Sequence, residues 1–398
     1  MTYAHQPDQL DDGDFACPAH VGDDDYLGQA VRDWVAEDPD ASGTCGLCAD
    51  TGMPVEQLLD LIDGGVAKFF ERAEDSQVYL EDDWLLSTSS AEEVLYDLGI
   101  DENSPLFYAA VEHMGEGPWV EHDWGWPSHQ RLMSDAWQAF VAHITHRSRF
   151  LFETDKTMNT FGGLDQLGTR DFLRGLVDAL SKRQIRVEDT DSQFFRARAI
   201  RLDKHPPATA DEYASPPPEK ASQGRMNPAG IAYFYGALDP ATAAVEVYGG
   251  DTYAALATFQ PTRQLRLVDL TKVELPSPFD DSVTLEEHHR ALFLIGFASD
   301  ISKPVIRDER VHQEYVPTQA VTEYIRFRSK PPVDGLLFSS ARTSGTNVVI
   351  FADQDRCLGR GTDPLLTPLD AMRRFDFGAP TITEGQPSRL TAAPLTPR

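Results

Sequence analysis

The 398-residue sequence has little cysteine, a shortage of basic residues and no long apolar run. Its four cysteines, three of them near the N-terminus, exclude a disulfide framework and indicate metal chemistry in a reducing compartment. No apolar run approaches membrane-spanning length, and Ala291–Ala298 is among the longest, so we expect no membrane segment. The N-terminus lacks a basic region followed by an apolar one, which predicts no secretory signal and a cytoplasmic location.

Charge limits the partners of the chain. Lysine and arginine number 35 against 64 aspartates and glutamates, for a net charge of −29. Such a balance repels phosphate backbones and argues against a nucleic-acid binder, although it is equally compatible with a solubility adaptation.

The N-terminal cysteines form two pairs of candidate metal ligands. Cys17 and His20 are separated by two residues, as are Cys45 and Cys48. Four nitrogen and sulfur ligands complete a tetrahedral structural zinc site. The alternatives are unpaired reduced cysteines, or a redox Cys-x-x-Cys motif at residues 45–48.

Periodicity divides the chain into an α-helical N-terminal half and an α+β C-terminal half. We expect a zinc-type unit with an acidic lead-in at 1–50, a helical domain at 51–185, a mixed domain at 190–365 and a mobile tail at 376–398. In the helical half, Gly64-Gly65 is expected to end a helix begun at Pro54. Ser89 with Glu92 predicts a capping box, and Thr169 an N-cap.

The C-terminal half alternates strands and helices. Strands are predicted at Phe194–Ile200, Ile231–Tyr235, Tyr253–Phe259, Gln264–Leu270, Gly335–Ser339 and Asn347–Phe351. Helices are predicted at Asp239–Tyr248, Leu285–Phe297 and Pro317–Arg328.

The most informative stretch is Gly224–Glu246, in which a glycine–arginine loop precedes an aromatic strand and a helix carrying Glu246. A lone carboxylate suits cleavage of a cationic leaving group from a sugar, because a pyridinium such as nicotinamide departs as a neutral ring without a general acid. NAD is therefore a candidate substrate. The alternative is that Glu246 is a solvated helical glutamate.

Candidate ligand-binding groups surround that glutamate in the sequence. Arg196 and Arg198 share one face of a strand and can bind a pyrophosphate, although Arg198 can instead pair with nearby aspartates. Gly224, Arg225 and Asn227 can form a loop of donors for phosphate or ribose, and Tyr235 can stack on a base.

These motifs together resemble the RES domain. The resemblance is carried in order by Phe195-Arg196, the Gly224–Gly230 run, Tyr235, Ala244-Val245-Glu246, Tyr315–Gln319 and Gly335–Arg342, and covers roughly residues 192–355. It implies an ADP-ribosyltransferase-like fold, consumption of NAD by hydrolysis or phosphorolysis, and in many members a toxin paired with an antitoxin protein.

The resemblance also assigns residues. The family arginine, tyrosine and glutamate fall on Arg196, Tyr235 and Glu246, and the family serine falls on Ser340, with Ser339 as the alternative. Where some members carry another serine, this chain has Val316.

We therefore predict an NAD-degrading enzyme with a RES domain behind a HEPN-like helical segment, NAD as its substrate and a structural zinc. The alternatives are a mono-ADP-ribosyltransferase, or an inactive RES-fold regulatory or interaction protein. An RNA-cleaving HEPN nuclease is disfavoured, because no arginine in residues 1–180 is followed by histidine at the spacing that such nucleases use.

Overall fold

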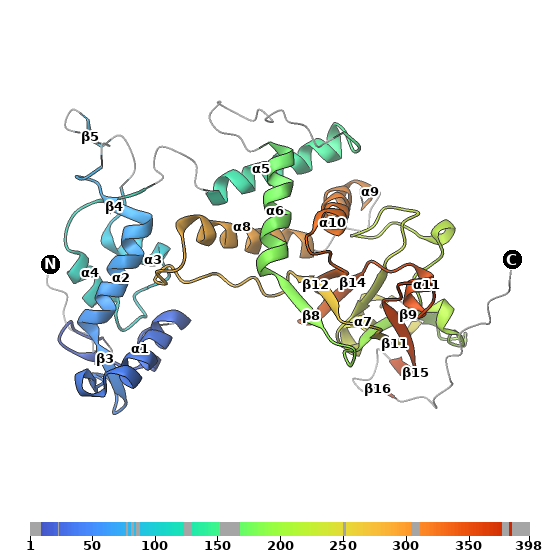
Figure 1. Cartoon of the computed structure of the whole chain (residues 1–398), viewed down its shortest axis with the longest axis horizontal. Helices are drawn as coiled ribbons and strands as arrows, with labels where there is room; N and C mark the ends of the chain where they lie inside the picture. The colour runs from blue at the N-terminus through green and yellow to red at the C-terminus, as the bar shows by residue number, and fades with distance from the viewer. Residues whose placement is uncertain are drawn as a thin grey trace. The chain divides into compact units, whose positions relative to one another are not determined.

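The computed structural model describes residues 9–22, 24–76, 79–80, 83–84, 88–122, 129–151, 168–249, 252–303, 311–375 and 382–383 (Figure 1). The chain forms two compact units. Unit 1 comprises residues 1–131 and 274–293, and unit 2 comprises residues 132–273 and 294–398. The fold confirms the predicted α+β class, whereas the four-part domain division remains a prediction. Nearly all of the predicted mobile tail lies outside the described residues.

Unit 1 is mainly helical, with a small sheet in the order β1-β3-β2 and two further strand pairs, β4-β7 and β5-β6. Its elements are β1 (Phe15–Ala16), α1 (Asp25–Glu37), β2 (Gly43–Thr44), β3 (Thr51–Pro54), α2 (Val55–Phe69), β4 (Phe70–Arg72), β5 (Tyr79–Leu80), β6 (Asp83–Trp84), α3 (Ala91–Asp97), α4 (Phe107–Met114) and β7 (Trp119–Glu121). One apolar core joins these helices, with Leu58, Ile62 and Leu95 among its buried members.

Two predicted boundaries in unit 1 are wrong. Helix α2 continues through Gly64-Gly65 to Phe69. Gly65 allows Phe279 to pack closely against the helix, because a Cβ at position 65 would lie 2.5 Å from a ring carbon of Phe279. The capping box is Ser90 with Glu93, one residue beyond the predicted pair.

Unit 2 is built on a nine-stranded sheet in the order β16-β15-β11-β9-β10-β14-β13-β12-β8. Its strands are β8 (Ile185–Glu188), β9 (Phe194–Arg201), β10 (Phe234–Ala237), β11 (Thr252–Pro261), β12 (Leu265–Asp269), β13 (Gly335–Ser339), β14 (Thr346–Ile350), β15 (Leu366–Phe375) and β16 (Ile382–Thr383). Its helices are α6 (Thr169–Arg183), α7 (Pro240–Glu246), α9 (Val311–Glu314), α10 (Val316–Arg328) and α11 (Gln354–Cys357). Helices α5 (His129–His146) and α8 (Leu285–Ser302) each have residues in both units. The N-cap of α6 is Gly168, not the predicted Thr169.

The register of this sheet creates an opening. Strand β10 pairs with β14 over four residues but with β9 at one position, Ala237 opposite Phe195. The two strands therefore diverge, and side chains from both can line a cavity. Strands β12 and β13 run parallel, so their carboxyl ends meet at one edge of the sheet.

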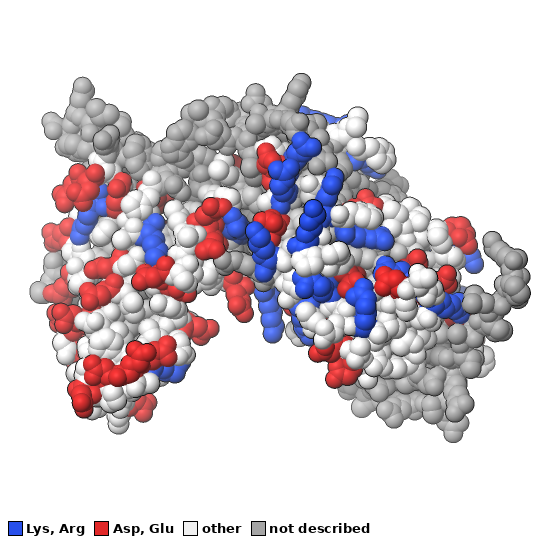
Figure 2. Space-filling model, in the orientation of Figure 1, with Lys and Arg blue, Asp and Glu red and all other residues white. Residues whose placement is uncertain are grey.

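The net charge is distributed unequally between the units. Unit 1 holds 35 acidic and 5 basic residues, a difference of −30, whereas unit 2 holds 29 and 30, a difference of +1. Figure 2 shows lysine and arginine side chains gathered over the region of α6 in unit 2. The acidic field predicted for the whole chain therefore belongs to unit 1, and unit 2 is close to neutral.

Among the described helices, none combines the length and the apolar composition needed to cross a bilayer.

Candidate active site and metal centre

A cavity of about 390 Å³ opens in unit 2 where β9 and β10 diverge. Strand β9, strand β10, the end of α7 and the segment after β13 all contribute lining residues. Its polar lining includes Arg196, Tyr235, Glu246, Tyr315, Arg342 and Asn347. The structure thus brings together three residues that the sequence separates by up to 50 positions, Arg196, Tyr235 and Glu246.

Glu246 lies at the last residue of α7, a helix that begins at Pro240 and is capped by the side chain of Asp239. Its carboxylate is held by one oxygen. The Ser340 hydroxyl donates to Oε1 at 2.8 Å, and the Asn347 amide donates to the same oxygen at 2.8 Å. Both of these bonds use Oε1, and the described residues give Oε2 no hydrogen bond, so that oxygen is available to a ligand.

Ser340 is itself fixed by the loop after β13. Its hydroxyl accepts hydrogen bonds from the backbone N–H groups of Arg342 and Thr343, at 3.1 and 3.3 Å. Ser339, the alternative for the family serine, is exposed at the end of β13 and lines the cavity. The two adjacent serines therefore differ in role: one orients Glu246 and the other faces the cavity.

Arg196 is a buried cation on β9. The residue is 8% exposed, and its Nη1 has no hydrogen-bond partner among the described residues. Its guanidinium carbon lies 5.2 Å from the ring centroid of Phe234. Burial, with a further contribution from the neighbouring charge of Arg198, lowers the pKa of Arg196 to about 9. A buried cation of this kind favours the binding of an anion.

Tyr235 is oriented by the loop before its strand. Its hydroxyl donates to the Asn227 carbonyl oxygen Oδ1 at 2.6 Å and accepts from the backbone N–H of Met226 at 3.0 Å. Burial raises the pKa of Tyr235, so the phenol remains protonated. Gly224 is required at this loop, because a Cβ would lie 2.6 Å from the Tyr235 hydroxyl.

The remaining predicted donors make contacts within the protein. The Asn227 amide nitrogen donates to three backbone carbonyls, those of Ser222, Pro228 and Ile231. Asn227 therefore shapes the loop.

The other two arginines of the predicted site anchor neighbouring segments. Arg198 donates to the carbonyls of Glu212 and Ala214. Arg225 donates to the carbonyls of Ile301 and Lys303, at and just beyond the end of α8. Both arginines also line the cavity.

Sequence reasoning missed the roles of Asn347 and Arg342. Asn347 is a buried polar residue on β14, opposite Ala237 on β10 and Phe338 on β13, so strand register brings it to Glu246. Arg342 donates to the carbonyl of Val245 beside the catalytic candidate. The sequence signal was weak: an asparagine at the start of an otherwise apolar strand.

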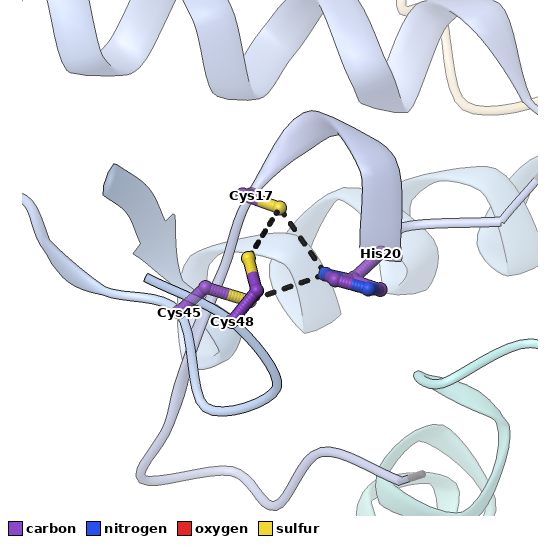
Figure 3. A group of neighbouring side chains, drawn as sticks. All are labelled: Cys17, His20, Cys45 and Cys48. Carbon is purple, nitrogen blue, oxygen red and sulfur yellow. Dashed lines mark hydrogen bonds between the residues drawn. The ribbon is translucent and has the colours of Figure 1, made fainter. Parts of the chain in front are cut away.

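The four predicted metal ligands converge in unit 1. Cys17, His20, Cys45 and Cys48 place their ligand atoms within 4.8 Å of one another. Figure 3 shows the four side chains gathered at one place. Cys17 Sγ lies 3.6 Å from Cys48 Sγ and 3.2 Å from His20 Nδ1, and Cys45 Sγ lies 3.4 Å from that nitrogen. This group can bind a metal.

Backbone hydrogen bonds and a close strand contact hold the four candidate metal ligands together. Cys45 N–H donates to the carbonyl of Asp50, closing the turn that carries Cys45 and Cys48, and Asp50 N–H lies 3.5 Å from Cys48 Sγ. Gly52 is needed where β3 meets β1, because a Cβ there would lie 2.4 Å from the backbone of Ala16. The two ligand pairs are therefore held together by a small sheet.

Comparison with known families agrees with this organisation. The RES domain model matches residues 194–371, and the model of HEPN/RES N-terminal domain 1 matches residues 38–158. The chain therefore contains a RES domain preceded by a HEPN/RES N-terminal domain, which matches a long-form RES protein.

Among solved structures, the chain is similar to one in the crystal structure of the M. tuberculosis MbcT–MbcA toxin–antitoxin complex. The identity is 18%, the match covers 50% of this chain and 92% of that chain, and the TM-score is 0.30. A comparison with curated proteins finds no match.

Proposed function

We propose that the protein degrades NAD by cleaving the bond between nicotinamide and ribose. The observation that carries the proposal is the pairing, in one cavity, of two groups: a buried cation whose Nη1 has no hydrogen-bond partner in the described part of the chain, and a carboxylate held by one oxygen. A dinucleotide offers both complements: a pyrophosphate for Arg196 and a ribose that becomes cationic for Glu246.

Glu246 acts through the oxygen that Ser340 and Asn347 leave open. As the carbon–nitrogen bond breaks, its electron pair passes to the ring nitrogen and nicotinamide leaves as a neutral molecule. Positive charge develops on the ribose, and the carboxylate stabilises it. No second carboxylate is needed, in contrast to ordinary glycosides, because the leaving group requires no proton.

The nucleophile completes the reaction at the ribose carbon. Water gives ADP-ribose and releases one proton, whereas inorganic phosphate gives ADP-ribose 1″-phosphate. Tyr235 is assigned to positioning the nicotinamide ribose with its ring, since its hydroxyl is engaged with Asn227. Ser340 and Asn347 are positioning residues that fix Glu246. Arg198 and Arg225 add positive charge to the lining while their own bonds hold the cavity walls.

The direct test is turnover of NAD by the purified full chain, with and without phosphate, with products separated by mass. We expect nicotinamide to be released and Glu246→Gln to reduce the rate by at least 100-fold. Free ADP-ribose would identify hydrolysis, and ADP-ribose 1″-phosphate would identify phosphorolysis. Labelled protein would identify ADP-ribosyl transfer. Intact NAD with wild-type protein would exclude the proposal and favour the inactive RES-fold alternative.

We further propose that Cys17, His20, Cys45 and Cys48 hold a structural zinc ion. Ligand bonds of about 2.3 Å to sulfur and 2.0–2.1 Å to nitrogen, arranged tetrahedrally, separate the ligand atoms by roughly 3.5–3.8 Å. Three of the six observed separations, 3.2–3.6 Å, lie close to that range, and all six are within 4.8 Å. Four protein ligands leave no position for water, so the ion would stabilise unit 1 and take no part in NAD cleavage.

Metal content of the purified protein tests this site. We expect one zinc per chain in wild type, less than a tenth of that in Cys45→Ser, and full content in Cys357→Ser. Cys357 is a suitable control because it is a buried cysteine in unit 2 that forms a hydrogen bond with Ser215 and lies outside the group of metal ligands. Equal zinc in all three proteins would refute the assignment.

An antitoxin partner and a toxic effect remain predictions from the family resemblance. Expression of the active chain in bacteria tests toxicity, with Glu246→Gln as the matched control. A growth defect present in both would not arise from NAD cleavage.

A further inference from the structure

A second groove of about 450 Å³ adjoins the candidate active site in unit 2. It shares two lining residues with the cavity, Ser302 and Ser339. One wall is the last part of α8, and the other is formed by residues that follow β12 together with Ser339, the last residue of the parallel strand β13. Ligands in α/β proteins commonly bind outside the carboxyl ends of parallel strands, and this groove lies at such an edge.

The lining of the groove combines apolar and polar side chains. Leu270, Val273, Ile295 and Ala298 supply the apolar surface, and Ile295 is 40% exposed. Ser299, Ser302 and Lys303 supply two hydroxyls and a cation. Thr271 is already engaged, because its hydroxyl donates to Asp269 at 2.6 Å. An apolar face with a few hydroxyls and one cation suits a flat base attached to a sugar phosphate.

The groove and the cavity are joined by a defined contact. Arg225, which lines the cavity, donates to the carbonyls of Ile301 and Lys303. The end of α8 is thereby fixed against the loop that orients Tyr235. Lys303 pairs with Asp300 on the surface, and exposed ion pairs of this kind are weak enough to exchange for a phosphate.

We propose that this groove binds the adenosine half of the dinucleotide while the cavity binds the nicotinamide half. This inference rests on the proposed function. A cavity of about 390 Å³ lies near the lower end of the roughly 300–1,000 Å³ that small-molecule sites occupy, and a dinucleotide is a large ligand. The second nucleoside therefore needs a further surface, and this groove shares Ser302 and Ser339 with the cavity.

Kinetics of the full chain test the inference with two half-ligands, AMP and nicotinamide mononucleotide. The variant Ile295→Asp places a charge on the exposed apolar lining, and Ser299→Trp fills the groove from an exposed position. Leu202→Asp is the matched control, because Leu202 is 63% exposed in unit 2 and lines neither the cavity nor the groove.

For Ile295→Asp and Ser299→Trp we expect the KM for NAD to rise at least fivefold with kcat within twofold of wild type. The inhibition constant of AMP should rise in parallel, and that of nicotinamide mononucleotide should stay unchanged. Leu202→Asp should match wild type in all four quantities.

Failure of this inference and failure of the proposed function give different results. If wild type cleaves NAD but the groove variants leave its KM and the inhibition by AMP unchanged, or shift both half-ligands equally, the groove assignment is overturned and the activity stands. If wild type leaves NAD intact, the proposed function fails, and calorimetry with AMP then tests the groove separately. AMP binding to wild type that is lost in Ile295→Asp would support the groove as a nucleotide site. No AMP binding to wild type would overturn the groove assignment.

Discussion

Replacement of Asn347 by aspartate tests how Glu246 is held. The change preserves the shape of the side chain but removes the amide that donates to Glu246 Oε1 at 2.8 Å, and it places a second negative charge beside the carboxylate. A hydrogen bond to a charged group is worth about 1.5–3 kcal/mol. If that stabilisation is expressed in the transition state, kcat should fall by about 10- to 150-fold, since each 1.36 kcal/mol is a factor of ten.

A double-mutant cycle distinguishes this specific effect from general damage. In the Glu246→Gln background the side chain at position 246 is neutral and carries an amide that can donate to the carboxylate introduced at position 347. The added change should therefore alter the residual rate by less than about threefold. Thermal melting of all four proteins controls for folding. The reasoning is refuted if Asn347→Asp lowers the rate by the same factor in both backgrounds, because the two side chains would then act independently.

Four further predictions concern charge and packing. Arg196→Met should raise the KM for NAD at least tenfold. The melting temperature of the ligand-free protein should stay equal or rise, because the change removes a buried charge. A clear drop in the melting temperature would indicate that the arginine is paired. Gly65→Ala should destabilise unit 1 by about 1–3 kcal/mol, because the added Cβ would clash with Phe279. Gly64→Ala should leave the stability unchanged, because the nearest atom to its added Cβ is 3.7 Å away. Denaturant titration of both variants measures the difference. A zinc chelator should lower the melting temperature of wild type and leave Cys45→Ser unaffected. Raising the salt concentration should raise the melting temperature of unit 1 and change that of unit 2 little, because only unit 1 carries a large net charge. Equal shifts of the two melting temperatures in calorimetry would contradict this.

Regular elements with a strong local pattern could be predicted from sequence. Strand β13 has its predicted bounds, and β9 and β14 lie within one residue of theirs. The predicted strand at Ile231–Tyr235 is shifted, because Asn227 uses the carbonyl of Ile231 to fold the preceding loop and β10 begins only at Phe234. Helix α8 extends five residues past its predicted end at Phe297, to Ser302. Strand β15 was not predicted at all: its residues alternate poorly, and pairing with β11 places them in the sheet.

The candidate site divides along similar lines. Motif order selected Arg196, Tyr235 and Glu246, and the structure brings these three residues into one cavity, while their roles stay predictions. The contacts that hold them could not be predicted, since they depend on register between distant segments. Asn347 meets Glu246 across 101 positions and Ser340 meets it across 94. Conversely, the sequence assigned Asn227 to a ligand, whereas the structure places its amide within its own loop, a choice that only backbone geometry decides.

The anchoring of Glu246 by one oxygen has an entropic consequence. A glutamate side chain loses up to roughly 1.5–2 kcal/mol of rotamer freedom when it is fixed. Ser340 and Asn347 impose that order while the chain folds, so the carboxylate is held before any ligand binds. In the proposed reaction, the ordering would thus be complete before the substrate binds, and binding would not have to supply it.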